Sequence, residues 1–420
     1  MTYQVEVFDL DYKGQGITKI NDKITFVKNL FEGEVALVTI DKTYKNYQEA
    51  SVVEYIKRSP NRVSDTYFDY APLAGLSLAS ECLWQEKITK ETLKKIGNLD
   101  VNVSDTITDG IKTHYRNKVT LHVVKKDKLV VGVYKANSRA LVHIDTHLLV
   151  KPILNETIQK INALFETYTF IDDTLKHMTL RTNGHEVMVI LSIRIKAYKE
   201  KDMLVMLLKP ICDSIYLSLS PNDYEILGDE VLHIYGKKTL PVNFGPLTYD
   251  IGAVGFFQVN EPISLKMYEF IKQHITGKNV LDAYAGMATI GQFLGQAFNV
   301  VAIESNHDAV IQAKDQINKN QLKNITIIEG DVNIEINNYI DQMDSIVFDP
   351  PRSGLDSDTV ELLLAHDIKQ IIYVSCDIKT LTRDLKMLSS RYDIISITPF
   401  RMFPSTDHVE TITLLSLKTS

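Results

Sequence analysis

From about residue 255 to the end of the chain, short apolar runs alternate with segments of helical pattern. The apolar runs lie at 280–281, 300–303, 325–328, 345–348 and 370–374. Alternation at this interval is typical of a doubly wound parallel sheet, because parallel strands need a crossover helix between them. The C-terminal part of the chain is therefore predicted to be α/β.

The chain has 420 residues, more than one hydrophobic core usually fills, so two or three domains are expected. Its 45% hydrophobic and 24% charged residues are typical of a soluble globular protein. No apolar run approaches the roughly 18 residues that span a bilayer, and no signal peptide is visible. Three scattered cysteines do not suit a disulfide framework. We therefore expect a cytoplasmic protein that does not bind membranes.

Residues 1–58 resemble a series of short strands, with suitable runs at 4–8, 23–27 and 34–40, and predict a small β-barrel. Cations and tyrosines are interleaved here: Lys42, Lys45, Lys57, Arg58, Arg62, Tyr44, Tyr47 and Tyr55. This mixture suits single-stranded nucleic acid, or else forms an ordinary solvated basic edge. Because the net charge is −7, any RNA binding must rest on such a local basic face.

A Ser-Pro-Asn turn at 59–61 marks the first boundary, and residues 59–245 are predicted to form a central α+β domain. Residues 81–97 have the pattern of an amphipathic helix that ends at glycine, and this helix is expected to pack on the C-terminal domain. A second helix is expected near 152–168. Four further runs indicate strands of an antiparallel sheet: 118–124, 129–134, 187–193 and 203–208.

The C-terminal domain, assigned to 246–420, begins with a strand that leads into a turn of small residues between Asp282 and Gly291. A Rossmann-like sheet uses such a turn to bring its backbone close to a ligand. Glu304 follows Asp282 by 22 residues, which suits a residue that holds ribose hydroxyls. Asp331 follows the third strand, and its carboxylate could accept a hydrogen bond from the amino group of an adenine. Because the turn is a poor phosphate loop, the pattern favours S-adenosylmethionine over NAD.

Cys376 lies just past the last of these apolar strands, and the motif Asp349–Gly354 follows the strand before it. The carboxyl ends of parallel strands open onto one crevice, so a thiol and a carboxylate are predicted to share a pocket. A lone cysteine after an apolar run is more often a small buried hydrophobe. The motifs around Cys376 decide between the two interpretations.

Five separated motifs resemble those of the RNA uracil-5 methyltransferases, in the same order and spacing. They are Gly255–Asn260, Asp282–Thr289, Asp349–Gly354, Val374–Asp384 and Phe403–Thr411. Residues 3–58 are similar to that family's TRAM domain, a small RNA-binding barrel. Residues 114–118 resemble the opening of its central domain, so the domain at 59–245 is expected to bind RNA as well. The resemblance covers nearly the whole chain. It implies an S-adenosylmethionine-dependent methyltransferase that acts on RNA.

The resemblance implies that Cys376 adds to C6 of a uracil, that C5 takes the methyl group of S-adenosylmethionine, and that Glu410 removes the C5 proton. Such addition makes C5 reactive, and polar surroundings at the strand end are expected to favour the thiolate by lowering the thiol pKa. The positions that correspond to the family's cofactor contacts are Gln258, Tyr284, Glu304, Asp349 and Asp331.

The chain departs from the family at several positions. Many members carry iron–sulfur ligands where Leu73 and Leu76 stand, and Cys82 has no neighbouring cysteine. We therefore predict no iron–sulfur cluster and no other metal. Asp377 and Ile378 follow Cys376 in place of the usual Asn-Pro. None of these differences removes a catalytic group.

The preferred hypothesis is a 23S rRNA (uracil-5-)-methyltransferase, because tRNA-specific relatives commonly lack a TRAM domain. The first alternative is a tRNA T-loop uridine methyltransferase. The second is a non-catalytic RNA-binding or assembly factor, which would not need both Cys376 and Glu410. Adenine and cytosine N-methyltransferases place an aromatic residue where Arg352 stands. RNA is the expected partner, with no obligate protein partner.

Overall fold

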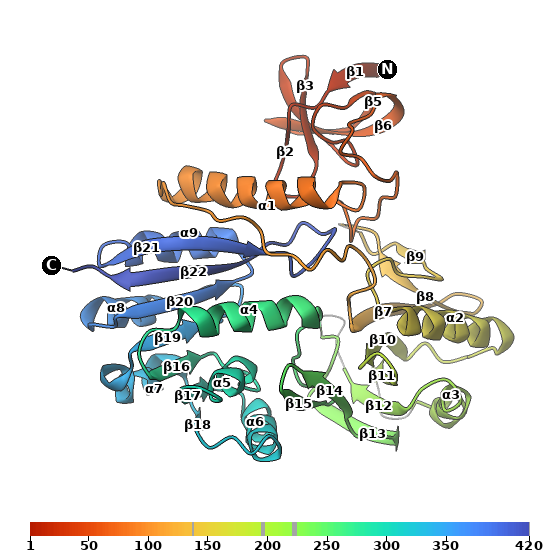
Figure 1. The fold of residues 1–420 in the computed structure, drawn as a ribbon. Helices are drawn as coiled ribbons and strands as arrows, with labels where there is room; N and C mark the ends of the chain where they lie inside the picture. Colours follow the sequence, from red (N-terminus) through yellow and green to blue (C-terminus); the bar gives the residue numbers. More distant parts are fainter. Residues whose placement is uncertain (137, 195–197, 221–224, 420) are drawn as a thin grey trace. The chain divides into compact units, whose positions relative to one another are not determined.

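The computed structural model describes residues 1–136, 138–194, 198–220 and 225–419 (Figure 1). These residues form two compact units. The first comprises Met1–Lys112, Pro262–Ala313 and Leu322–Ser420, and the second comprises Thr113–Glu261 and Lys314–Gln321. The division into domains at 1–58, 59–245 and 246–420 stays a prediction.

A curved six-stranded sheet forms the N-terminal part of the first unit, in the order β1-β5-β6-β4-β3-β2. Its strands are β1 (Thr2–Glu6), β2 (Asp9–Leu10), β3 (Gly16–Ile20), β4 (Lys23–Val27), β5 (Val35–Thr43) and β6 (Tyr47–Lys57). Alternate side chains, among them Val5, Val27 and Val38, are buried in one small core. Register shifts between β5 and β6 bend this pair, as a small barrel requires. The expected β-rich N-terminus is confirmed.

The C-terminal part of the first unit is a seven-stranded sheet, ordered β18-β17-β16-β19-β20-β22-β21. Its strands are β16 (Asn279–Ala283), β17 (Asn299–Glu304), β18 (Ile325–Glu329), β19 (Ser345–Phe348), β20 (Gln370–Ser375), β21 (Tyr392–Phe400) and β22 (Glu410–Leu417). The helices around it are α4 (Glu261–His274), α5 (Thr289–Leu294), α6 (His307–Lys319), α7 (Val332–Glu335), α8 (Ser357–Ala365) and α9 (Ile378–Leu388). The first five strands are parallel, and strands are added on either side of β16. The predicted α/β fold is confirmed, and β16 marks the switch point at which such sheets bind ligands.

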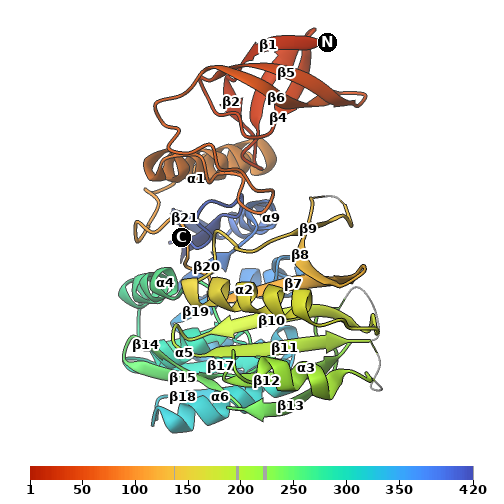
Figure 2. The ribbon, with the colours of Figure 1, turned by 90° about the vertical axis from the view of Figure 1, so that its right-hand side faces the viewer.

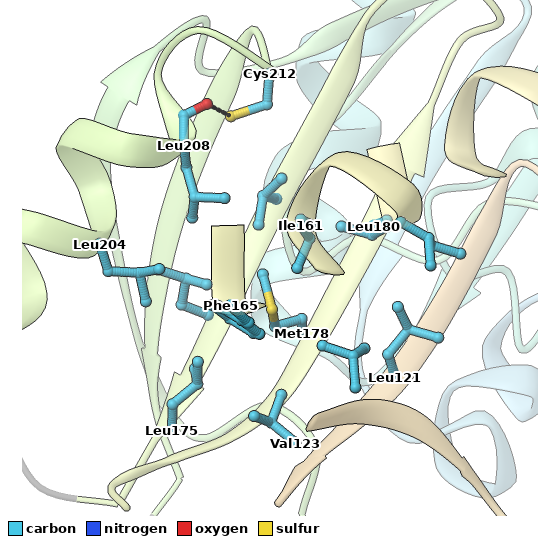
Figure 3. Close-up of a cluster of buried hydrophobic side chains, with 14 of the residues drawn as sticks. Leu121, Val123, Ile161, Phe165, Leu175, Met178, Leu180, Leu204, Leu208 and Cys212 are labelled. Atoms are coloured by element: carbon cyan, nitrogen blue, oxygen red, sulfur yellow. Dashed lines mark hydrogen bonds between the residues drawn. The ribbon is translucent and has the colours of Figure 1, made fainter. Parts of the chain in front are cut away.

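The second unit is built on another seven-stranded sheet, ordered β13-β12-β11-β10-β7-β8-β9. Its strands are β7 (Lys118–Lys125), β8 (Leu129–Tyr134), β9 (Leu141–His143), β10 (Leu175–Thr182), β11 (Val187–Ile193), β12 (Ser214–Leu219) and β13 (Glu230–Gly236). Helices α2 (Pro152–Thr167) and α3 (Lys201–Leu208) pack on one face of this sheet (Figure 2). Phe165, Leu180 and Leu204 lie in the shared core (Figure 3). A hairpin of β14 (Leu240–Phe244) and β15 (Leu247–Ile251) follows.

The expected strand at 203–208 is wrong, because these residues lie in α3. The buried side chains of α3 are Leu204, Val205 and Leu208, a helical spacing, whereas Met206 is 62% exposed. A short apolar run fits a helix as well as a strand, so its pattern alone does not decide. Since α3 is a crossover helix, β11 and β12 pair in parallel, and the sheet is mixed rather than purely antiparallel.

The expected amphipathic helix forms α1 (Leu78–Thr92), which continues into a π-helical turn at Leu93–Gly97. Asn98 ends it in the left-handed conformation, with a φ of 55°. A Cβ atom on Gly97 would lie 2.6 Å from the Cγ2 atom of Thr382 in α9. Glycine at this position therefore permits the close approach of the two helices within the first unit.

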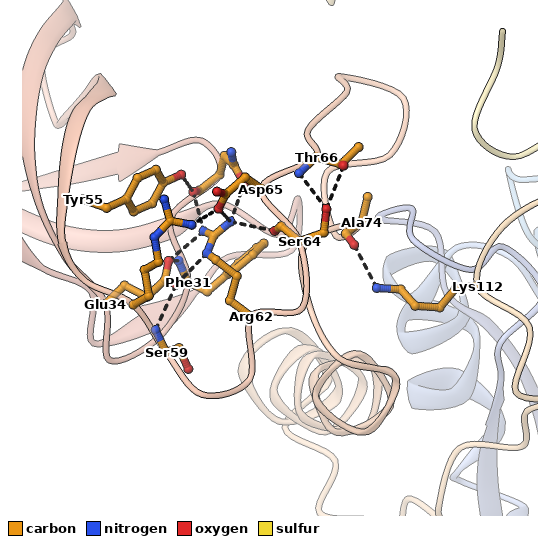
Figure 4. Close-up of polar contacts among 12 residues, drawn as sticks. Phe31, Glu34, Tyr55, Ser59, Arg62, Ser64, Asp65, Thr66, Ala74 and Lys112 are labelled. Atoms are coloured by element: carbon orange, nitrogen blue, oxygen red, sulfur yellow. Dashed lines mark hydrogen bonds and ion pairs between the residues drawn. The ribbon is translucent and has the colours of Figure 1, made fainter.

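A buried ion pair between Glu34 and Arg62 joins the barrel to the segment that follows it (Figure 4). The Nε and Nη2 atoms of Arg62 donate to the two carboxylate oxygens at 2.7 Å each. Only 3% of the Arg62 side chain and none of the Glu34 side chain is exposed. The guanidinium also lies 4.9 Å from the ring centroid of Tyr55. Arg62 therefore belongs to the interior rather than to the expected basic surface, whereas Lys42 and Lys45 are exposed.

Replacing Arg62 with methionine leaves Glu34 buried without its cationic partner. Loss of one partner of a buried pair costs about 3–5 kcal/mol. We expect Arg62→Met to lower the free energy of unfolding of the barrel by that amount. The measurement is the urea dependence of hydrogen exchange in peptides from residues 1–58. Arg58→Met is the matched control, because Arg58 pairs with Asp65 on the surface, and it should cost less than about 1 kcal/mol. Equal losses in the two variants would contradict this account.

Candidate active site

Three strand ends meet at one edge of the C-terminal sheet. Asp349 directly follows β19, and Cys376 directly follows the neighbouring parallel strand β20. β22 is antiparallel to β20, so its first residue, Glu410, lies at the same edge. The order and direction of the strands thus bring a thiol and two carboxyl groups together.

Burial dominates the electrostatics of this edge. It raises the pKa of Asp349 to about 7 and, together with the charge of Asp349, raises the pKa of Glu410 well above its usual range. Burial also raises the pKa of the Cys376 thiol to about 11, and the two carboxylates add to this effect, whereas Arg352 opposes it. The expected lowering of the thiol pKa is therefore wrong. Dehydration and two negative charges outweigh one guanidinium.

A pocket of about 210 Å³ is lined by Cys376 and by side chains from distant parts of the first unit. Tyr12 comes from the barrel segment, Thr92 from α1, Arg352 from the segment after β19 and Lys379 from α9. The Nζ atom of Lys379 lies 4.1 Å from the ring centroid of Tyr12, a cation–π contact. The lining also includes the carboxylates of Asp377 and Asp407, so an aromatic ring, hydrogen-bond donors and hydrogen-bond acceptors surround the thiol, as suits the ring and edge of a planar base.

Asp377 begins α9 and caps it. Its Oδ1 atom accepts from the backbone N–H groups of Lys379 and Thr380, at 2.9 and 3.0 Å. An aspartate here therefore makes the capping contacts that an asparagine would make. Ile378 takes the first helical position, where the family usually has proline. The departure from the family motif thus leaves the start of the helix intact.

A second buried ion pair fixes residues 401–409, the segment that leads to Glu410. The Nη2 atom of Arg401 donates to the Oε2 atom of Glu81 in α1 at 2.7 Å, and neither side chain is exposed. The other carboxylate oxygen of Glu81 accepts from the backbone N–H of Ser405, also at 2.7 Å. Because Glu410 directly follows this segment, α1 determines where β22 begins.

The turn after β16 offers hydrogen-bond acceptors at the switch point of the sheet. The Oδ2 atom of Asp282 accepts from the backbone N–H of Gly291 at 2.8 Å, whereas its buried Oδ1 atom has no partner among the described residues. Glu304 accepts from the backbone N–H of Gly286 at 2.7 Å. Burial and the negative charges of Asp349 and Glu304 raise the pKa of Asp282 to about 7. These carboxyl groups favour a ligand that brings a cation or hydrogen-bond donors.

Besides Asp349, which follows β19, three residues expected to contact the cofactor in the first unit lie at the ends of three adjacent strands. Tyr284 follows β16 and has a φ of 61°, a left-handed conformation that is uncommon for residues other than glycine. Glu304 ends β17. Asp331 follows β18 and accepts from the backbone N–H of Asn333 at 2.9 Å, which caps α7. The acidic strand ends are therefore side by side, and their contact with a cofactor stays a prediction.

Gln258 belongs to the second unit, between β15 and α4. Its backbone carbonyl accepts from the Nδ2 atom of Asn117 at 3.0 Å. Asn117 also donates to Glu261 at 2.8 Å, so one buried amide holds this segment at two points. The role of Gln258 in cofactor binding stays a prediction.

Leu73 and Leu76 lie in a buried apolar cluster with Phe31, Trp84 and Val409. Within the described part of the chain, no group of three or more His, Cys, Asp or Glu side chains is placed to hold a metal ion. Nor does any helix described here have the length and apolar character needed to cross a membrane. The burial of Leu73 and Leu76 shows that the stretch at 71–76 is packed as hydrophobic core.

The roles of Glu81, Arg401 and Tyr12 were not predicted from the sequence. Glu81 and Arg401 are 320 residues apart, and no local pattern links them. The available signal was the position of Arg401 just before the motif Phe403–Thr411. Tyr12 follows a two-residue strand and has the sequence context of an ordinary loop tyrosine.

Two family models match the chain: a TRAM domain over residues 1–53 and tRNA (Uracil-5-)-methyltransferase over residues 84–418. A protein of Enterococcus faecalis described as an uncharacterized RNA methyltransferase is 30% identical, across 98% of this chain and 96% of its own. A protein of Fusobacterium nucleatum with the same description is 28% identical, across 99% and 96%. The crystal structure of Pyrococcus abyssi tRNA (uracil-54, C5)-methyltransferase in complex with S-adenosyl-L-homocysteine has a TM-score of 0.78 at 22% identity, and the match covers 99% of this chain and 100% of that one.

The fold and the acidic edge of its C-terminal sheet define a methyltransferase of the doubly wound α/β class with an N-terminal TRAM domain. Within this class, the chain belongs to the tRNA (uracil-5-)-methyltransferase family, whose model matches most of its length. The family resemblance of the five sequence motifs is thereby confirmed.

The raised pKa of Cys376 predicts slow alkylation at neutral pH, because the thiolate is the reactive form. We expect the rate with iodoacetamide, followed by mass spectrometry of the Cys376 peptide, to rise with pH up to about 11. Glu410→Gln should raise the rate at pH 9 by removing a negative charge, and Arg352→Gln should lower it. Glu361→Gln, on an exposed part of α8, is the matched control and should change nothing. A midpoint at or below the ordinary thiol pKa of about 8.5 would contradict this prediction.

Proposed function

We propose that this chain methylates C5 of a uridine in RNA, with 23S rRNA as the first candidate substrate. The observation that carries the proposal is the meeting of Cys376, Asp349 and Glu410 at one sheet edge, in a chain of the uracil-5 methyltransferase family. The TRAM domain supports RNA as the substrate.

The methyl donor is S-adenosylmethionine, which when bound supplies an electrophilic methyl group on a cationic sulfur. The acidic strand ends fit this ligand, because the buried Oδ1 atom of Asp282 lacks a partner among the described residues and can accept from a donor or face a cation. We assign the ribose hydroxyls to Glu304 and the adenine amino group to Asp331. Tyr284 and Asp349 complete the set proposed in the first unit.

Cys376 is the proposed nucleophile. C5 of uracil reacts poorly until a group adds to C6, because that addition places electron density on C5. The thiol first loses its proton to solvent, and Arg352, the cation that opposes the rise of its pKa, stabilises the thiolate. The Sγ–C6 bond then forms, and the electron pair of the C5–C6 double bond moves to C5, which can then take the methyl group while S-adenosylhomocysteine leaves.

Glu410 completes the reaction by removing the remaining proton from C5. The Sγ–C6 bond then breaks, the C5–C6 double bond returns, and Cys376 is released. A carboxylate whose pKa lies well above its usual range is a stronger proton acceptor than an ordinary glutamate. Asp349, with a pKa of about 7, is able to donate a hydrogen bond to the uracil edge in its protonated form.

The T-loop uridine of tRNA is the second candidate substrate. The Pyrococcus abyssi enzyme, described as a tRNA (uracil-54, C5)-methyltransferase, matches over its whole length, which includes the region of the barrel. The same fold therefore occurs in an enzyme described as acting on tRNA, which supports tRNA as a candidate substrate.

The experiment incubates the protein with tritiated S-adenosylmethionine and separate pools of unmethylated 23S rRNA and tRNA. We expect 5-methyluridine in one pool. Cys376→Ala should lose activity by on the order of 10³-fold or more, and Glu410→Gln should accumulate a covalent protein–RNA adduct because release from C5 is blocked.

Cys82→Ala is the matched control, since Cys82 does not line the pocket, and it should keep activity within about twofold of wild type. Transfer to neither pool, with cofactor and RNA still bound, would favour the non-catalytic RNA-binding alternative. Full activity in Cys376→Ala would refute the proposed mechanism.

A further inference from the structure

The sheet of the second unit presents a second face at β7, β8 and β10. Val119, Leu121 and Val123 of β7 point into the core beneath α2. Side chains alternate along a strand, so His122 points to the opposite face. On that face, a pocket of about 280 Å³ is lined by residues of all three strands and of the segments that follow β8 and β11.

The floor of this pocket is a stack of aromatic rings. The rings of His122 and Tyr134 are parallel to within 20°, with centroids 3.9 Å apart. The Nδ1 atoms of His122 and His177 lie 3.1 Å apart, in hydrogen-bond contact. Burial and the neighbouring His177 lower the pKa of His122 to about 4, so this ring is a neutral stacking surface at physiological pH. Tyr134 remains 38% exposed, which leaves part of its ring open to the pocket and solvent.

The rim of the pocket is cationic. Among the described residues, its lining includes four cations, Lys125, Lys176, Arg139 and Arg194, and one carboxylate, Asp173. Asp173 lies 3.4 Å from Lys176 and so offsets one of these charges. In a chain of net charge −7, this is a local concentration of positive charge beside exposed aromatic surface. Anionic phosphate and a flat base are the two groups that this combination binds together.

We propose that this pocket binds one unpaired nucleotide of the RNA substrate, other than the uridine to be methylated. Its base stacks on Tyr134, and its phosphate pairs with Arg139 and Arg194. The inference rests on the proposed function only in that RNA is the substrate. An acidic peptide would match the cations and would leave the stacked rings without a role, so RNA is the better match.

The test measures binding of fluorescein-labelled, unmethylated 23S rRNA and tRNA transcripts to the full chain, by fluorescence anisotropy without S-adenosylmethionine. Tyr134→Ala should weaken the Kd by about tenfold, within the range that loss of one stacked base produces. Arg139→Glu should weaken it similarly and reduce its dependence on salt. Tyr134→Phe keeps the ring and should bind as wild type does.

Lys160→Glu makes the same charge change as Arg139→Glu at an exposed position of α2, which covers the other face of the sheet, and it should stay within about twofold of wild type. Binding within about twofold of wild type in both Tyr134→Ala and Arg139→Glu, with melting temperatures unchanged, would overturn the proposal. The proposal would also be overturned if the wild type bound polyglutamate and both variants lost that binding while they kept their affinity for RNA. This binding assay contains no S-adenosylmethionine and measures no methyl transfer. Its result therefore tests the nucleotide pocket independently of whether the chain methylates RNA.

Discussion

The ion pair between Glu81 and Arg401 is the interaction on which the candidate site depends. Neither side chain reaches solvent, so the pair carries a large desolvation cost that close hydrogen bonds must offset. It ties α1 to the segment that delivers Glu410 to the sheet edge. The same helix holds the barrel, because the Nε1 atom of Trp84 donates to the carbonyl oxygen of Asp11 at 3.1 Å. One helix therefore positions two parts of the pocket lining: the segment just before β22, which includes Val409, and the barrel segment next to Tyr12.

Buried carboxyl groups give the site its chemical character. Asp282, Asp349 and Glu410 are dehydrated near one another, and each has a raised pKa. The same conditions raise the pKa of the Cys376 thiol to about 11, so the proposed nucleophile is mostly protonated at neutral pH. Such a site favours ligands that carry positive charge or donate hydrogen bonds, as S-adenosylmethionine does.

The parallel sheet and the meeting of its strand-end motifs could be predicted from the sequence, because alternation of strands and helices fixes which ends of parallel strands share an edge. The helix at Lys201–Leu208 could not, since a short apolar run has no distinct period. Arg62 has the sequence context of a surface cation, and only the fold shows that Glu34 draws it inside. The pairing of Glu81 with Arg401 and the raised thiol pKa both depend on contacts between distant segments, which no local pattern encodes.

The central claim, that Cys376 attacks the uracil ring, is tested most directly with RNA transcripts that contain 5-fluorouridine. Fluorine at C5 cannot be removed by Glu410 as a proton, so the Sγ–C6 bond should persist after methyl transfer. Our account predicts that mass spectrometry finds a nucleotide adduct on the Cys376 peptide, and none on the peptides of Cys82 and Cys212. Methylation of ordinary transcripts with no adduct on Cys376 in the fluorinated ones would contradict it.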